Sequence, residues 1–148
     1  MKCDIIEMYT DGACSSNPGP AGIGIVIKYN GQRKEISDYI GRSTNNKAEL
    51  EAISRGLGHI MFGCSIQFLT NNVIIYTDSI YSINVISNKW KSKKNKELIE
   101  IIQEMITDHF NATFIKIKAH NGNIENEKAD QLAKEAIDRN RRNNGKQG

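Results

Sequence analysis

The chain has 148 residues, of which 39% are hydrophobic and 25% are charged, and its formal net charge is +3. This length is enough for one domain with a buried core, and no apolar stretch is long enough to span a membrane. Because the first residues lack the apolar core of a signal peptide and the three cysteines show no paired spacing, we expect a cytoplasmic protein with reduced thiols and no membrane partner.

The first part of the chain predicts three antiparallel strands. The apolar run Ile5–Thr10 is typical of a buried strand, and it ends at Asp11, where a loop rich in glycine and proline begins. Residues 23–29 and 33–40 predict two further strands. The Asn-Gly pair between them, at Asn30, is a strong hairpin signal.

The middle of the chain predicts a helix and a parallel strand, and each is associated with an acid in an unusual place. The helix covers Lys47–Met61, and Glu49 lies on the flank of its apolar stripe, a position that an ordinary boundary glutamate could also occupy. Residues 73–77 form a continuous apolar run typical of a central parallel strand, and Asp78 follows at once. Sites form at the ends of parallel strands, so Asp78 is a candidate site residue. Ser79 can cap the next helix.

A basic segment then leads to a helix and a last strand. Five lysines surround Trp90, and such a cluster is either a solvated face or a contact for a phosphate backbone. A core-packed helix is predicted to begin near Asn95, and residues 113–118 predict the last strand. The order of elements indicates a mixed sheet with helices packed on it.

The last helix follows a polar loop that contains His120. Asp130 lies beside the apolar stripe of this helix, one turn from its start. His120 is either an ordinary loop residue or a group that transfers protons. Residues 139–148 have no large apolar side chain, so we expect one domain over residues 1–138 and a basic, disordered tail after it.

Four acids therefore stand at strand ends or beside apolar stripes. If they converge, their negative charges repel one another unless cations neutralise them. Carboxylate oxygens select Mg²⁺ or Mn²⁺ over zinc, and two such ions about 4 Å apart suit the hydrolysis of a phosphodiester. A single structural Ca²⁺ is an alternative, but the chain has no EF-hand loop, and its glycines match neither common phosphate-binding motif. The four acids are Asp11, Glu49, Asp78 and Asp130.

Four segments, in order, resemble the ribonuclease H family, type 1 class: YTDGACSSNPGPAG, RSTNNKAELEAI, IIYTDSIYSI and KAHNGNIENEKADQLAKEA. The resemblance implies an α/β fold with a five-stranded mixed sheet, three antiparallel strands and then two parallel ones, flanked by helices. It also implies a monomeric endonuclease that hydrolyses the RNA strand of RNA–DNA hybrids. The implied mechanism uses two Mg²⁺ ions, with Mn²⁺ as a substitute, and leaves 5′-phosphate and 3′-hydroxyl products.

The resemblance also implies roles for individual residues. Metal binding and catalysis fall to Asp11, Glu49, Asp78 and Asp130, and His120 joins them as a catalytic residue. Turn and cap chemistry would account equally well for three of the residues implied to contact substrate, namely Asn17, Thr44 and Asn45. The implied substrate contacts are Cys14, Asn17, Arg42, Thr44, Asn45, Asn46, Trp90 and Asn95.

The chain departs from the family pattern between its second and third predicted helices. Many members carry a basic, tryptophan-containing protrusion there, whereas this chain offers only Ser87–Lys94, as in the family's short forms. We expect the lysines around Trp90 to compensate by contacting the phosphate backbone. Ile80 stands where the family often has Gln or Met, which predicts a weaker or purely apolar contact.

Two other functions remain open from the sequence. One is a non-catalytic module that binds hybrids, which the complete set of carboxylates and His120 argues against. The other is a different two-metal nuclease of the same fold, such as a junction resolvase or a transposase core. The element at Thr44, Asn45 and Asn46 favours ribonuclease H over it.

Overall fold

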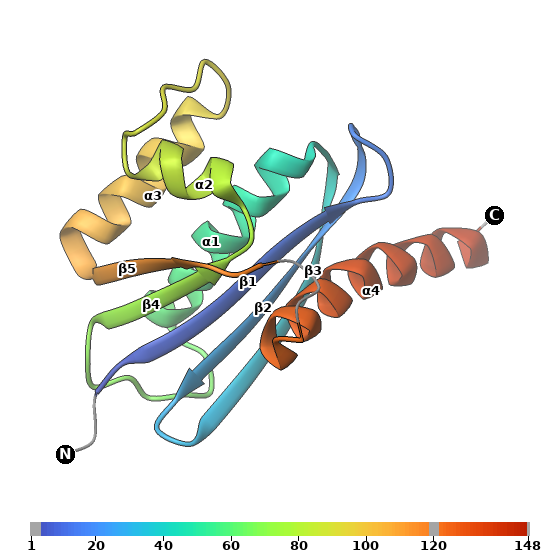
Figure 1. The fold of residues 1–148 in the computed structure, drawn as a ribbon. Helices are drawn as coiled ribbons and strands as arrows, with labels where there is room; N and C mark the ends of the chain where they lie inside the picture. The colour runs from blue at the N-terminus through green and yellow to red at the C-terminus, as the bar shows by residue number, and fades with distance from the viewer. Residues whose placement is uncertain (1–3, 119–121, 148) are drawn as a thin grey trace.

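The computed structural model describes residues 4–118 and 122–147. Three successive strands open the chain, and helices and two further strands follow, as expected for a mixed sheet with helices packed on it (Figure 1). The elements are β1 (Ile6–Cys14), β2 (Gly19–Tyr29), β3 (Gln32–Ser43), α1 (Asn45–Phe62), β4 (Asn72–Thr77), α2 (Ile80–Ile86), α3 (Lys96–His109), β5 (Asn111–Lys116) and α4 (Ile124–Gln147).

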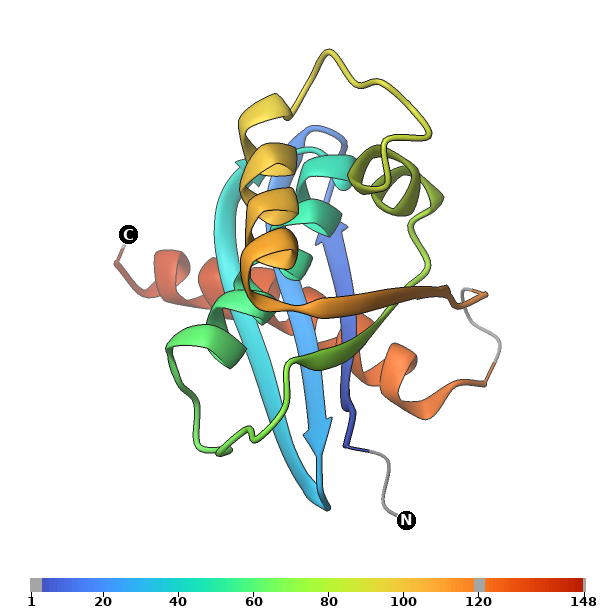
Figure 2. The same cartoon turned by 90° about the vertical axis from the view of Figure 1, so that its left-hand side faces the viewer.

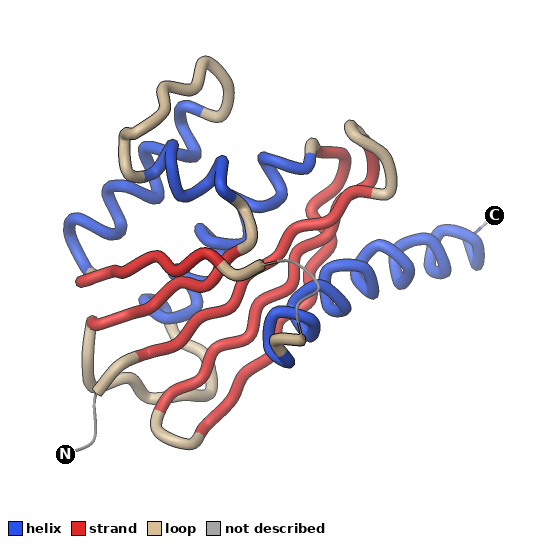
Figure 3. Tube along the Cα trace, in the orientation of Figure 1, coloured by secondary structure: helices blue, strands red, loops and turns tan. Residues whose placement is uncertain are grey.

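The strands form one sheet in the order β3-β2-β1-β4-β5. β1, β2 and β3 pair antiparallel, while β1, β4 and β5 pair parallel, which confirms the predicted fold class. α1, α2 and α3 lie on one face of this sheet and α4 lies on the other (Figures 1 and 2). The long β1–β2–β3 meander and the shorter parallel strands are also visible in the tube trace (Figure 3). The four candidate acids therefore lie on or next to sheet strands and on helices from both faces of the sheet.

The first two strands are longer than the sequence predicted. β1 does not end before Asp11 but continues to Cys14, because β2 begins at Gly19 and supplies partners along the whole stretch, from Glu7↔Lys28 to Cys14↔Ala21. The glycine- and proline-rich segment is therefore mostly strand. At the other end, the predicted hairpin is confirmed: Asn30 and Gly31 have positive φ values of 50° and 78°.

Glycines on the first two strands let helices approach the sheet backbone closely. A Cβ atom at Gly12 would lie 2.4 Å from the carbonyl carbon of Ala48 in α1. On the other face, a Cβ atom at Gly24 would lie 1.9 Å from the carbonyl oxygen of Ala129 in α4. Gly24 is the register partner of Asp11 on the neighbouring strand. The contact between α4 and β2 therefore lies directly beside one of the candidate site residues.

The larger hydrophobic core lies between the sheet and α1, with fully buried Met8, Ile25 and Leu50 among its members. A smaller cluster under α4 contains Val26 and Leu132. Burial of this apolar surface is the main favourable term that holds the helices on the sheet.

The last helix differs from the prediction. α4 continues to Gln147, so residues 139–147 of the segment expected to be a disordered tail are helical in the structure. Arg139 connects the start of this segment to β3, because its Nη2 donates to the Ser37 carbonyl oxygen at 2.8 Å. In the described part of the chain, no helix is long and apolar enough to cross a membrane.

Candidate active site

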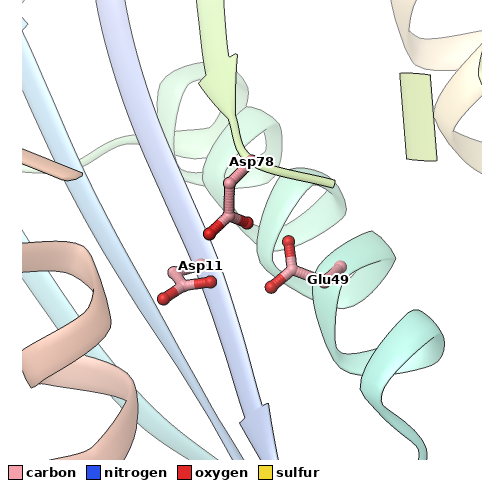
Figure 4. A group of neighbouring side chains, drawn as sticks. All are labelled: Asp11, Glu49 and Asp78. Atoms are coloured by element: carbon pink, nitrogen blue, oxygen red, sulfur yellow. The ribbon is translucent and has the colours of Figure 1, made fainter. Parts of the chain in front are cut away.

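Three acidic side chains from separate elements meet beside the end of β4 (Figure 4). The parallel pairing of β1 with β4 ends at Tyr9↔Tyr76, and Asp11 and Asp78 each lie two residues beyond that pair. Glu49 reaches them from the first part of α1. One carboxylate oxygen from each residue lies within 4.8 Å of the others. We refer to Asp11, Glu49 and Asp78 as the three-carboxylate group.

Glu49 is held by the immediate neighbours of the other two acids. The backbone N–H of Gly12 donates to Glu49 Oε1 at 2.8 Å, and the Thr77 hydroxyl donates to Glu49 Oε2 at 3.4 Å. Glu49 is only 9% exposed, so its predicted place beside the apolar stripe is a buried one. The backbone next to Asp11 and the side chain next to Asp78 thus fix the orientation of this carboxylate.

The electrostatics of the group oppose three negative charges. Burial raises the pKa of the Asp11 carboxyl far above its usual range, and the charges of Glu49 and Asp78 raise it further. Burial also raises the pKa of Glu49, while the hydrogen bonds from Gly12 and Thr77 act in the opposite direction. A divalent cation would reverse this balance because it favours the ionised form of each oxygen ligand. The three carboxylates supply oxygen ligands, and their unfavourable ionisation in the absence of a cation also fits a metal site.

Asp130 approaches this group from α4 but is not part of its tight cluster. It raises the pKa of Asp11 and lines the same open cleft, which has a volume of about 440 Å³. Its Oδ2 lies 2.9 Å from Lys134 Nζ, one helical turn further along α4. All four acids predicted from the sequence therefore face one cleft. His120 lies outside the described residues.

A second cleft, of about 580 Å³, adjoins the first and contains many of the predicted substrate contacts. Asn45 and Asn46 line both clefts. Three lysines of the basic segment contribute to its wall, so the structure brings this segment beside the predicted contacts. The lining residues include Asn17, Thr44, Asn45, Asn46, Asn95, Tyr81, Lys91, Lys93 and Lys94.

Two of these residues also have the structural roles that turn and cap chemistry predicts. The Thr44 hydroxyl caps α1 by accepting from Lys47 N at 3.2 Å, and Asn17 Oδ1 accepts from Asn45 N at 3.1 Å. The second contact joins the β1–β2 loop to the start of α1. Both roles shape the cleft, and neither prevents the other side-chain atoms from contacting a ligand.

Three predicted substrate contacts lie outside the lining of this cleft. Arg42 is exposed on β3, and Cys14 points its thiol to the Ser43 carbonyl oxygen at 3.7 Å. Trp90 is 49% exposed, and its backbone N–H bonds to Asn84 O at 3.1 Å. The side chains of Arg42 and Trp90 are therefore accessible at the surface, Cys14 is partly buried, and none of the three lines the cleft.

Tyr81 supports the basic segment and was not predicted from the sequence. Its hydroxyl lies 2.8 Å from Ser92 Oγ and accepts from Asn95 Nδ2 at 3.2 Å, and Ser92 Oγ donates to Lys94 O at 2.7 Å. These bonds connect α2 with the start of α3. No pattern in the sequence indicates them, because they link residues that are 11 and 14 positions apart across an irregular segment.

Comparison with known proteins agrees with this geometry. The model of the RNase H family matches residues 4–138. A ribonuclease H from Thermoanaerobacter sp. (strain X514) is 37% identical, with 97% of each chain covered. A ribonuclease H from Desulforamulus reducens is 42% identical over 86% of this chain and 84% of its own.

Solved structures extend the likeness to three dimensions. LC11-RNase H1, isolated from compost by a metagenomic approach, is 36% identical with a TM-score of 0.77, covering 93% of this chain and 98% of its own. The same protein in complex with an RNA/DNA hybrid gives a TM-score of 0.76 at 36% identity, covering 90% and 97%. Sequence, fold and the acidic cleft thus agree, and the chain belongs to the ribonuclease H family.

Proposed function

We propose that this chain is an endonuclease that hydrolyses the RNA strand of RNA–DNA hybrids and requires divalent cations, Mg²⁺ in the first place and Mn²⁺ as a substitute. The observation that carries the proposal is the three-carboxylate group, whose oxygens lie within 4.8 Å of one another at the base of an open cleft. The hybrid complex of LC11-RNase H1, a relative of the same fold, supports the substrate class.

The acids of the cleft would hold the metal. Asp11, Glu49 and Asp78 supply hard oxygen ligands, and Asp130 adds a fourth from the opposite side of the sheet. Two bound divalent ions would activate the attacking water and neutralise the developing negative charge at the scissile phosphate. The residues' own contribution is orientation, since the Gly12 N–H and the Thr77 hydroxyl already fix Glu49.

His120 is proposed to move protons or assist product release. The expected products carry a 5′-phosphate and a 3′-hydroxyl.

The neighbouring cleft would receive the hybrid. Asn17 and Asn45 offer amide groups suited to the RNA strand's 2′-hydroxyls, and Asn46 lines the same cleft. Cys14, outside this lining, is proposed to contact the same strand. Thr44, Asn95 and Arg42 are proposed to contact a phosphate of the DNA strand, and Trp90 to pack on a deoxyribose. Lys91, Lys93 and Lys94 add positive charge along the same path.

A cleavage assay with three duplexes tests this function. The protein is incubated with Mg²⁺ and labelled RNA–DNA hybrid, double-stranded RNA or double-stranded DNA, and we expect cutting only in the RNA of the hybrid. Asp11→Asn and Asp78→Asn should each lower kcat by at least about a thousandfold, because each removes a charged oxygen ligand. Asp108→Asn, an exposed acid on α3, is the matched control and should keep wild-type activity.

The other outcomes separate the alternatives. Full activity in Asp11→Asn or Asp78→Asn would refute the proposed site. Binding of the hybrid without cutting would indicate the non-catalytic module, and cutting of double-stranded DNA would indicate another two-metal nuclease of this fold. Circular dichroism of each variant shows whether a fall in activity reflects chemistry or unfolding.

A further inference from the structure

A network of ion pairs ties the start of α4 to the β2–β3 hairpin. Arg33 of β3 donates from Nε to Glu125 Oε2 at 3.1 Å and from Nη2 to Glu125 Oε1 at 2.7 Å. Such a two-bond contact between guanidinium and carboxylate is both stronger and more directional than a single ion pair. Lys28, the register partner of Arg33 on β2, approaches the same carboxylate at 3.5 Å. The Glu125 side chain is only 12% exposed at this contact.

The network has a second link to the same helix. Arg33 also contacts Glu35, whose Oε1 lies 3.8 Å from Lys128 Nζ. Glu125 and Lys128 are three residues apart, so they lie on one face of the first turns of α4. The hairpin therefore holds the helix at two points. A bidentate contact within a network is the case in which ion pairs near the surface do contribute to stability.

The position of Asp130 depends on where this part of α4 lies. Asp130 follows Glu125 by five residues, which is about 7.5 Å along the helix axis. It is the acid that does not belong to the tight group, and its own ion pair is to Lys134 on the same helix. Asp130 reaches the Asp11 side chain from α4, so this contact depends on the placement of that helix. Glu49, in contrast, is fixed by hydrogen bonds to the neighbours of the other two acids.

We propose that Arg33 and Glu125 are positioning residues: their contact fixes the start of α4 on the hairpin and so holds Asp130 against the three-carboxylate group. This inference rests on the proposed function, because it gives Asp130 a part in the active site. The pair acts through the helix, so its removal should change catalysis and metal dependence and leave hybrid binding almost unchanged. A misplacement of about 1 Å in a catalytic group is enough for a large fall in rate.

Cleavage kinetics at varied Mg²⁺ concentration provide the first test. We expect Arg33→Ala to lower kcat about tenfold and to raise the Mg²⁺ midpoint severalfold, with the KM for the hybrid within about twofold of wild type. Arg33→Lys keeps the charge without the two-bond geometry and should recover part of the activity. Arg55→Ala is the matched control, because Arg55 pairs with Glu51 on α1 through one 3.3 Å contact at similar exposure, and it should behave as wild type.

Amide hydrogen exchange of the metal-free protein gives a readout that does not depend on cleavage. In Arg33→Ala, peptides covering residues 124–130 should exchange faster, while peptides from α1 keep their wild-type protection. The double variant Arg33→Ala/Glu125→Ala should be less impaired than the sum of the two single variants, because the two residues share their main contact. Glu125→Ala should be the more severe single variant, since it also removes the contact with Lys28.

The outcomes distinguish this inference from the proposed function. If Arg33→Ala retains the wild-type kcat, Mg²⁺ midpoint and exchange pattern while the wild type cleaves hybrids, the positioning role is refuted and the function stands. A change in KM alone would mean that Arg33 contacts the hybrid directly, which also refutes it. Failure of the wild type to cleave would refute the proposed function, and the positioning role with it. Thermal unfolding of each variant excludes global unfolding as the cause.

Discussion

Asp11 is an acidic residue in the interior of β1, and its surroundings favour the protonated, neutral form of its carboxyl group. It is 6% exposed, and burial together with the neighbouring acids raises its pKa. An acid whose pKa is raised in the folded state contributes stability that is fully present below the unfolded-state pKa of about 4 and is lost as the pH rises from there through the folded-state value. At neutral pH the unfolded chain ionises this acid whereas the metal-free folded protein keeps it protonated, so position 11 lowers the stability of the fold relative to acid pH.

Because the pKa of Asp11 is raised, replacing this acid should stabilise the metal-free protein at high pH. In metal-free buffer at pH 8, Asp11→Asn should unfold at a higher temperature than the wild type, by roughly 2–4 °C for each kcal/mol of this protonation cost that is removed. At pH 4 the two proteins should unfold at nearly the same temperature, because the wild-type acid is then protonated in the folded state and about half protonated in the unfolded state, which leaves little difference in bound protons. Calorimetry at both pH values measures the difference.

Mg²⁺ provides the complementary measurement on the same pair of proteins. Because a ligand that binds only the folded state stabilises it, Mg²⁺ should raise the unfolding temperature of the wild type more than that of Asp11→Asn. Equal effects of Mg²⁺ on both proteins would show that Asp11 is not a metal ligand. An exposed variant, Asp108→Asn, should respond to Mg²⁺ as the wild type does.

Gly24 determines how closely α4 approaches the sheet. A methyl group there would lie 1.9 Å from the Ala129 carbonyl oxygen, which belongs to the helix backbone and cannot rotate away. Gly24→Ala should therefore push α4 outward, lower the free energy of unfolding by roughly 1–3 kcal/mol and reduce activity through Asp130. Urea unfolding and cleavage rates of the purified variant check both effects.

Gly58→Ala is the control for that substitution. Gly58 lies inside α1, and apart from its chain neighbours and the adjoining backbone of its own helix, no heavy atom of the described residues would come within 4 Å of its new Cβ. Alanine favours the helix over glycine, so this variant should gain about 0.5–1 kcal/mol and keep its activity. A Gly24→Ala variant as stable and active as the wild type would contradict the packing argument.

At the level of elements, the start of α4 is held by charge as well as by packing. Hydrogen bonds and the positive charge of Arg33 lower the pKa of Glu125. An acid with a lowered pKa contributes stability above its unfolded-state pKa of about 4.3, and this contribution disappears as the pH falls through the lower folded-state value. The ion pair should therefore stabilise the protein at neutral pH and not in strong acid.

The comparison of wild type with Glu125→Gln tests this dependence. At pH 7 the variant should unfold at a lower temperature, and the gap should close as the pH is lowered to about 3. Because all other acids are common to both proteins, the difference reports on position 125 alone. A gap that is independent of pH would indicate that packing, and not charge, explains any effect.

The parts of the fold that depend on local pattern could be predicted from the sequence. The apolar run before Asp78, the cap at Ser79 and the Asn30 hairpin turn all occur where expected, since each depends on a few adjacent residues. The interior position of Asp11 could not be predicted in this way. Its strand continues through a segment whose glycines suggest a loop, because β2 pairs with it and α1 packs on it.

Contacts between residues far apart in the sequence also could not be predicted from local patterns. Arg33 and Glu125 are 92 residues apart, and neither lies in a motif that points to the other. The acids of the site could be recognised because each occupies a locally unusual position. Their convergence depends on the parallel register of β1 with β4, which places Asp11 and Asp78 at the same level of the sheet.

For the whole molecule, we expect the positive charge on one side of the second cleft to compensate for the short form of the chain. Lys93 and Lys94 line that cleft, whereas Arg141 and Arg142 lie in the exposed last turns of α4, toward the C-terminal end in Figure 1. Binding to phosphates releases counterions, so each neutralised phosphate adds to the dependence of affinity on salt. The two basic pairs carry the same charge but should differ in what they bind.

Hybrid affinity measured against salt concentration separates these two pairs. Lys93→Ala/Lys94→Ala should weaken binding and reduce the slope of log K against log salt by roughly 1 for each phosphate that is no longer neutralised, about 2 in total. Arg141→Ala/Arg142→Ala removes the same charge and should leave the slope nearly unchanged. Binding is measured with Asp11→Asn so that the hybrid stays intact. Equal slopes for the two double variants would mean that general charge attraction, and not the cleft, holds the hybrid.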